Sequence, residues 1–200
     1  AEAAVLFSKL AGTDGSRYQN DARLAAARAY FRAEKYDEAS TLFATFLQTE
    51  GRVASEAAHW QARILLASNR AEEALHLVDR MLPNATKEGH PFAVNLQLDR
   101  ADATYELPDR KRQALELYRQ IARDNSDHSL APQSLYNAAF AALELKEYRT
   151  AAQLVHEFLS QYADHRLVPE VKRIDAECRL QLGEADKAAE IFGELVAANP

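Results

Sequence analysis

The sequence predicts an all-α protein built from repeated pairs of antiparallel helices. An alanine recurs along the chain with a bulky apolar residue four positions later and another three positions after that, as at Ala39, Phe43 and Phe46. Residues three and four apart lie on one face of a helix, so each recurrence marks an amphipathic helix. The sequence shows no β-rich alternating segment, which makes an all-helical fold the simplest interpretation.

The recurrence has a regular period. The anchoring alanines are separated by 36, 35, 40, 37 and 37 residues, and they stand at Ala3, Ala39, Ala74, Ala114, Ala151 and Ala188. Twelve positions before each full anchor stand Ala27, Ala62, Asp102, Ala139 and Ala176. Small residues allow two helices to approach closely, so we expect these alanines to be buried where helices cross. A period of this length indicates a solenoid, in which each unit contacts its neighbours.

Periodicity and turn residues place about eleven helices in order. We expect the second helix of an incomplete unit over residues 1–12, and full helix pairs over residues 17–50, 53–83, 91–124, 131–162 and 168–198. Within the first pair, the break between the helices falls at Glu34 and Lys35. The extra residues from Asn84 to His90 predict an exposed, mobile loop. Because the chain begins inside a second-helix pattern and stops at a unit boundary, we expect a fragment of a longer protein.

A linker also repeats. The sequence DHSLAPQ at residues 127–133 returns 37 residues later as DHRLVPE at residues 164–170. Each proline is expected in the first turn of the next helix, where a missing N–H costs nothing. His128 and His165 are equivalent by repeat, which indicates a linker role.

The pattern resembles the tetratricopeptide repeat (TPR) family over nearly the whole chain. The resemblance is carried by the small residue, Tyr30, the turn at residues 36–39 and Phe43, and the turn recurs at residues 148–151 and 183–188. It implies a single right-handed α-solenoid (a TPR-like superhelix) whose first helices line a concave groove. The resemblance therefore predicts a non-catalytic scaffold that binds a protein or peptide. The longer linkers resemble TPR proteins of the bacterial cell envelope and favour the periplasm over the cytoplasm.

Composition narrows the classes of function. The net charge of −6 argues against a nucleic-acid partner, since such partners select basic proteins. The single cysteine, Cys178, rules out an intramolecular disulfide. The sequence contains no apolar run of the ~18 residues that a membrane-spanning helix needs, so we expect no direct membrane insertion by this segment.

Residue patterns for catalysis are not found. A hydrolase needs a nucleophile, a base and an orienting group, and Cys178 has no such signature around it. No two of the six histidines stand four apart on a helix, so the two-histidine zinc arrangement is absent. We therefore expect no catalytic residue, metal or cofactor.

Register places a candidate partner-binding groove on the first helices. It consists of Arg28, Arg32, His59, Trp60, Arg63, Arg100, Tyr136, Asn137 and Phe140. Register assigns Leu24, Asp99, Ala103 and Ile174 to the same face. Arginine and aromatic residues are favoured at interface hot spots, so we expect a peptide or helix with acidic and apolar groups. On this hypothesis, glutamates in place of Arg28 and Arg63 abolish binding and leave the melting temperature nearly unchanged. The alternative is that the arginines pair internally with Asp21, Glu56 and Asp99.

Two charged sites interrupt the apolar pattern. Asp102 takes the place of a small residue, and it marks either a local salt bridge or a ligand site. Asp175 and Arg179 are four residues apart and can pair on one helix face. Two other functions stay open: a structural spacer or oligomerisation module that self-associates through the ends of the array, and an accessory domain of an enzyme whose catalytic part lies outside this chain.

Overall fold

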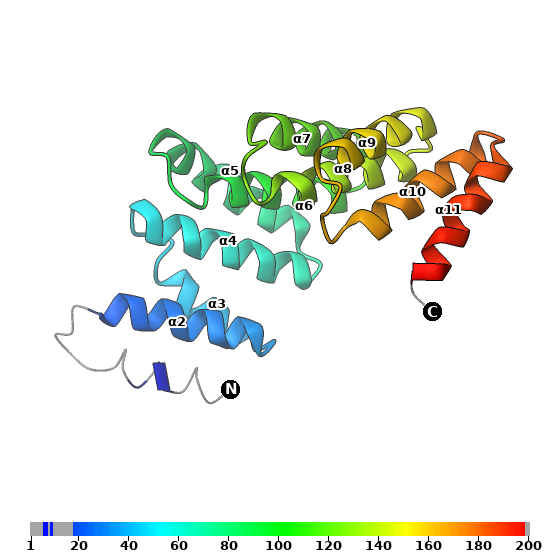
Figure 1. Cartoon of the computed structure of the whole chain (residues 1–200). Helices are drawn as coiled ribbons and strands as arrows, with labels where there is room; N and C mark the ends of the chain where they lie inside the picture. The colour runs from blue at the N-terminus through cyan, green and yellow to red at the C-terminus, as the bar shows by residue number, and fades with distance from the viewer. Residues whose placement is uncertain (1–5, 8, 10–17, 199–200) are drawn as a thin grey trace. The chain divides into compact units, whose positions relative to one another are not determined.

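A computed structural model describes residues 6, 7, 9 and 18–198, and this part of the chain contains ten α-helices and no strand (Figure 1). The helices belong to two compact units, residues 1–103 and residues 104–200, and the division falls inside α6. The helix expected over residues 1–12 lies largely outside the described residues.

Unit 1 contains two helix pairs and most of a further helix: α2 (Gln19–Arg32), α3 (Tyr36–Ala44), α4 (Gly51–Ala67), α5 (Ala71–Lys87) and α6 (Ala93–Glu106). Helix α2 packs on α3, and α4 packs on α5. Contacts also join α2 to α4, so the first helices of neighbouring pairs lie side by side.

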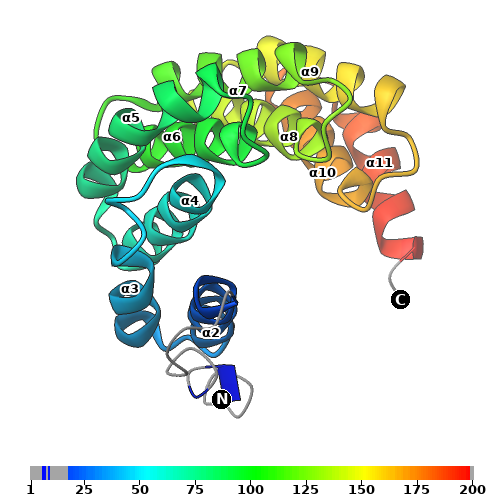
Figure 2. The same ribbon diagram turned by 90° about the vertical axis from the view of Figure 1, so that its left-hand side faces the viewer.

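Unit 2 continues with α7 (Lys111–Asp124), α8 (Ala131–Glu144), α9 (Tyr148–Gln161), α10 (Val168–Gln181) and α11 (Ala185–Ala198). Figure 2 shows α10 between α8 and α11, and contacts join α10 to α8, α9 and α11. Here too the first helices of neighbouring pairs, α8 and α10, are adjacent.

The turn inside each pair uses one backbone conformation. Its central residue has a positive φ angle of 57°, 56°, 59°, 59° and 84° at Glu34, Asn69, Asp109, Lys146 and Gly183 respectively. In four of the five turns the next N–H group bonds back to a carbonyl five residues earlier, as from Lys35 to Tyr30 at 3.0 Å. This is the Schellman type of helix end, which satisfies carbonyl groups left open by the last turn. The break predicted at Glu34 and Lys35 is therefore confirmed.

Alanines fill the helix crossings. The small-residue positions Ala27, Ala62, Ala139 and Ala176 have no exposed surface, and the anchors from Ala39 to Ala188 are at most 2% exposed. Around Ala62 the core of unit 1 includes Leu65, Val78 and Leu96. The predicted burial of these alanines is confirmed.

The repeated linker folds in the same way before α8 and before α10. Pro132 and Pro169 lie in the first turns of α8 and α10. The Nδ1 atoms of His128 and His165 accept hydrogen bonds from the N–H groups two residues later, at 3.1 Å and 3.2 Å. The predicted linker role of these histidines is confirmed.

The prediction of an exposed loop from Asn84 to His90 is wrong for most of that segment. Helix α5 continues through Pro83 and ends at Lys87, and the turn that follows it contains Gly89, which has a φ of 62°. The proline loses one helical hydrogen bond, but the next turn buries Ala85 completely in the core of unit 1. The extra residues in this repeat therefore extend α5 by about one turn.

Candidate functional site

Helices α2, α4 and α6 of unit 1 carry a network of charged side chains that we call the first-helix face of unit 1. It consists of Arg28, Glu56, His59, Arg63, Asp99 and Asp102. Helix α4 supplies three of these residues, spaced three and four apart, so they point from one side of the helix. Its charges link α4 to α2 on one side and to α6 on the other.

Arg28 on α2 faces Glu56 on α4. The Nη1 atom of Arg28 lies 3.1 Å from Oε1 of Glu56, and the side chains are 41% and 4% exposed. The contact lacks hydrogen-bond geometry, and that oxygen has no hydrogen-bond partner in the described part of the chain. Glu56 is therefore a buried carboxylate that is balanced chiefly by the charge of Arg28.

On the other side of α4, His59 and Arg63 contact α6. His59 Nδ1 and Asp99 Oδ2 are 2.6 Å apart, while Arg63 donates to Asp102 at 2.6 Å and lies 3.9 Å from Asp99. Burial raises the pKa of the Asp99 carboxyl, and the hydrogen bond with His59 opposes that shift. The salt-bridge interpretation of Asp102 is thus confirmed.

These contacts support the alternative in which the arginines pair internally. Arg28 and Arg63 pair with acids of the chain, and Arg100 pairs with Asp79 on α5 at 2.7 Å. Arg32, in the last turn of α2, is exposed. Replacing Arg28 with glutamate would place a second carboxylate against buried Glu56, so we expect a lower melting temperature for that variant in place of a nearly unchanged one.

Aromatic rings pack beside the network. Trp60 contacts Phe31, His59 and Phe43, with ring centroids 5.0, 4.9 and 6.4 Å apart. His59 also contacts Phe92, a residue that the sequence interpretation did not assign to the site. The indole N–H of Trp60 is buried and has no acceptor in the described part of the chain, so packing alone holds the ring.

Unit 2 brings its predicted site residues together on α8. Tyr136 and Phe140 stack with centroids 6.3 Å apart, and Gln133 donates to Asn137 at 2.8 Å. Tyr105 lies 6.4 Å from Phe140. All three predicted residues of α8 are partly exposed, and they form a neutral aromatic surface.

Four residues that register assigned to the groove are buried. Leu24, Asp99, Ala103 and Ile174 are between 0% and 4% exposed. Each lies where its first helix packs against neighbouring helices, so only part of the face assigned by register reaches solvent. These assignments are corrected, with Asp99 retained as the buried partner of His59.

At the end of α10, the predicted pair of Asp175 and Arg179 forms. The guanidinium group donates to Asp175 at 3.0 Å and to Glu184 at 2.9 Å. Cys178, on the same helix, is fully buried, and burial raises the pKa of its thiol to about 11. A buried, protonated thiol is a poor nucleophile, which agrees with a structural role.

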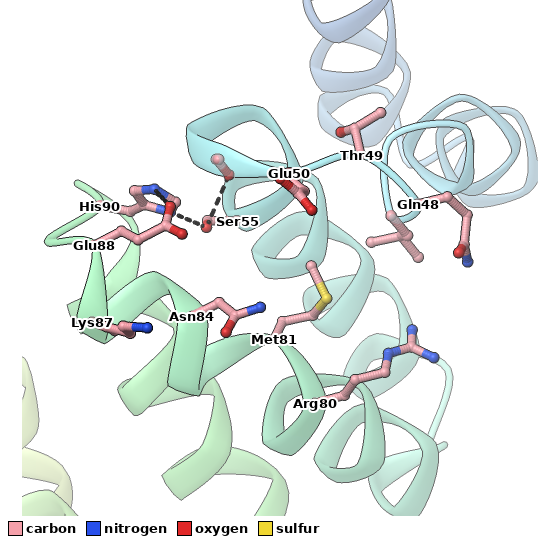
Figure 3. Close-up of a pocket in the computed structure, with 13 residues that line it drawn as sticks. Gln48, Thr49, Glu50, Ser55, Arg80, Met81, Asn84, Lys87, Glu88 and His90 are labelled. Carbon is pink, nitrogen blue, oxygen red and sulfur yellow. Dashed lines mark hydrogen bonds and ion pairs between the residues drawn. The ribbon is translucent and has the colours of Figure 1, made fainter.

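A second polar cluster lies between the start of α4 and the end of α5, beside a cavity of about 380 Å³ (Figure 3). His90 Nδ1 is 2.8 Å from the Ser55 hydroxyl, and His90 Nε2 is 2.8 Å from Glu88. A serine, a histidine and a carboxylate in series resemble a hydrolase triad in composition. Ser55 is only 3% exposed, however, and its hydroxyl also donates to the Gly51 carbonyl at 3.3 Å. The contact between His90 and Ser55 therefore holds the connection between α5 and α6 against α4.

Two further features of the described residues concern metal ions and membranes. They contain no group of three or more histidine, cysteine, aspartate or glutamate side chains arranged to hold a metal ion. None of their helices is long and apolar enough to cross a membrane.

Comparison with solved structures identifies the fold. A putative kinesin light chain from Podosopora anserina with nearly identical TPR-like repeats matches with a TM-score of 0.73 at 20% identity, over 91% of this chain and 96% of that chain. The apo form of RapI matches with a TM-score of 0.77 at 15% identity, over 88% and 69% of the two chains. TTC0263, a thermophilic TPR protein in Thermus thermophilus, matches with a TM-score of 0.62 at 20% identity, over 90% and 92%.

No family model matches the sequence, and a search of curated proteins finds no match. The structural matches show that the chain has the fold of TPR proteins, an α-solenoid of antiparallel helix pairs. The fold class predicted from the repeats is confirmed.

Proposed function

We propose that this protein is a non-catalytic scaffold that binds a segment of another protein on its first helices. The observation that carries the proposal is the setting of Arg28 and Arg63. Each side chain is 41% exposed and contacts an acid of the chain. On their helices, Arg28 stands three residues before Phe31 and Arg63 three residues after Trp60, and these two rings are in contact. A guanidinium group has five N–H donors, and these contacts engage only some of them.

The acids orient the arginines before a ligand arrives. Glu56 is buried, and Asp102 accepts a 2.6 Å hydrogen bond from Arg63, so neither guanidinium group swings freely. Binding then costs less side-chain entropy than it would for free arginines. Preorganised donors of this kind suit carbonyl or carboxylate acceptors of an extended segment.

Charge balance defines the ligand further. Glu56, Asp99 and Asp102 offset Arg28 and Arg63, so the first-helix face of unit 1 carries little net charge. We therefore expect recognition through hydrogen-bond acceptors and apolar side chains, and a weaker dependence on salt than a bare basic strip would show. Partly exposed Phe31, Trp60 and Phe92 supply the apolar contacts.

A displayed library of random peptides, selected on the whole protein, tests the proposal. The selected peptides are titrated while the fluorescence of Trp60, the single tryptophan, is recorded. The double variant Arg28→Lys, Arg63→Lys keeps both charges but removes the planar donor groups. It is expected to weaken binding about tenfold or more.

Arg80→Lys is the matched control, because Arg80 is an exposed arginine on the second helix α5 and does not belong to the first-helix face of unit 1. It is expected to bind as the wild type does. Peptides that bind the double lysine variant as tightly as the wild type, or lose affinity equally in the control, would contradict the proposal.

A further inference from the structure

The second full helix pair contains extra residues, and they line a cavity. Its anchoring alanine, Ala74, is followed by the next anchor after 40 residues, whereas the other neighbouring anchors stand 35 to 37 residues apart. Helix α5 has 17 residues, and α3, α7, α9 and α11 have at most 14 each. The end of α5 and the turn after it supply Asn84, Lys87, Glu88 and His90 to the cavity beside the start of α4. The other helix pairs form without this extension, so the fold alone does not require these residues.

The cavity lies between the α3–α4 connection, the start of α4 and the last two turns of α5. In Figure 3, Asn84 and Met81 reach from α5 toward the start of α4, and Lys87 and Arg80 lie on either side of them. The volume of about 380 Å³ falls within the range of about 300–1,000 Å³ that small-molecule sites occupy. None of the lining residues belongs to the first-helix face of unit 1, so a ligand here would bind at a separate site.

Three charged side chains at the cavity lack a partner. Within the described part of the chain, Glu50, Arg80 and Lys87 make no salt bridge and no side-chain hydrogen bond. Glu88, the fourth, contacts His90 at 2.8 Å. The arginines of the first-helix face of unit 1, by contrast, contact acids of the chain. The cavity therefore offers two positive charges and one negative charge to a ligand.

We propose that this cavity binds a small molecule with two anionic groups and one ammonium group, as an acidic amino acid has. Residues 80, 84 and 87 follow one another four and three apart, so they lie along one face of α5. At 1.5 Å per residue, Arg80 and Lys87 stand about 10 Å apart along the helix axis. The two carboxylates of the ligand meet these cations, and the ammonium group meets Glu50 from the α4 side. The amides of Gln48 and Asn84 make no hydrogen bond within the described residues, and they supply further donors and acceptors.

The pattern of charges determines which ligands fit. A ligand without the ammonium group leaves Glu50 unpaired and adds a carboxylate beside it, and a ligand with one carboxylate leaves one cation unpaired. Glutamate holds its two carboxylates farther apart than aspartate does, so it spans Arg80 and Lys87 better. The charged side chains are exposed, so each contact contributes modestly and recognition depends on all three together.

Isothermal titration calorimetry of the whole 200-residue chain with L-glutamate and L-aspartate tests the proposal. Glutamate is expected to bind at a single saturable site, and aspartate to bind more weakly. Glutamine lacks the second carboxylate, and the amide of N-acetylglutamate carries no positive charge. Each is expected to bind about tenfold more weakly than glutamate, or worse. Added salt should weaken the binding of glutamate, because exposed charges are screened.

Two sets of variants separate the charges. Arg80→Gln combined with Lys87→Gln removes both cations and is expected to weaken glutamate binding about tenfold or more. Both side chains are exposed, so the melting temperature is expected to stay near that of the wild type. Glu50→Gln is expected to reduce the preference for glutamate over N-acetylglutamate. Arg149→Gln, at an exposed position of α9 in unit 2, is the matched control and is expected to bind glutamate as the wild type does.

Four results would each overturn the proposal. Glutamate fails to bind, or it binds no better than glutamine or N-acetylglutamate. The double glutamine variant binds glutamate as tightly as the wild type, or the control loses affinity to the same extent.

Discussion

The first helices of the two units differ in chemistry although they share one repeat. Three residues before the small-residue position stand His59 and Asp99 in unit 1, and Tyr136 and Arg173 in unit 2. In unit 1, His59 and buried Asp99 form a pair 2.6 Å apart. In unit 2, Tyr136 stacks on Phe140, and Arg173 pairs with Glu177 near the surface. The repeat thus keeps alanine at four of its five small-residue positions and leaves neighbouring first-helix positions free to carry polar or aromatic groups.

The largest effect expected from this difference comes from removing one arginine in each unit. Arg28→Ala leaves Glu56 buried without its counter-ion, and we expect a loss of about 2–3 kcal/mol in the free energy of unfolding, less than for a fully buried pair. Arg173→Ala breaks an exposed pair with Glu177 and should cost about 0.5 kcal/mol or less. Urea denaturation followed by circular dichroism measures both, and equal losses would contradict the comparison.

Overpacking is expected to affect both units alike, because the crossings are common to them. Ala62→Leu in unit 1 and Ala139→Leu in unit 2 each enlarge a fully buried side chain and should cost about 1–3 kcal/mol. Ala67→Leu, at an exposed position of α4, is the control and should change stability little. The melting temperatures of the three variants test this prediction. A leucine variant at Ala62 or Ala139 with the melting temperature of the wild type would show that the helix crossing is loosely packed.

The pH dependence of stability should reveal the buried acid of unit 1. Burial raises the pKa of the Asp99 carboxyl in the folded protein above its ordinary value of 3.8. At pH values between the ordinary pKa and the raised pKa, the folded state therefore binds more protons than the unfolded state. The Asp99 contribution to stability therefore falls as pH rises through that window. Asp99→Asn removes this contribution, and its stability relative to the wild type should rise with pH there. A difference that is flat from acid to neutral pH would contradict this assignment.

Smaller effects than those of overpacking are expected at the turns, where the units are alike. Lys146 has a φ of 59°, a conformation that costs a residue with a side chain about 1–2 kcal/mol. Lys146→Gly should relieve part of this strain and stabilise the protein by about 0.5–1 kcal/mol, and Glu34→Gly should do the same in unit 1. Gly183→Ala should destabilise by a similar amount. Chemical denaturation would refute the interpretation if the lysine variant were less stable than the wild type.

The repeat made the helix pairs, the crossing alanines and the turn at Glu34 predictable, because each depends on local spacing. Pairing between helices was harder to predict, since register places Arg28 and Arg63 at equivalent positions but does not say which acid each one meets. The extension of α5 was missed because Pro83 signals an end, whereas burial of Ala85 decides the outcome. The contact of His90 with Ser55 joins residues 35 apart in sequence and has no counterpart at His128 or His165.

Amide hydrogen exchange of the protein with and without a selected peptide tests the proposed binding face most directly. Bound peptide is expected to slow exchange in α2, α4 and α6 near Arg28, Trp60 and Arg63, or in α8 near Tyr136 and Phe140. Helices α3, α5, α7 and α9 are expected to exchange as in the free protein. Protection confined to these second helices, with the first helices unchanged, would contradict it.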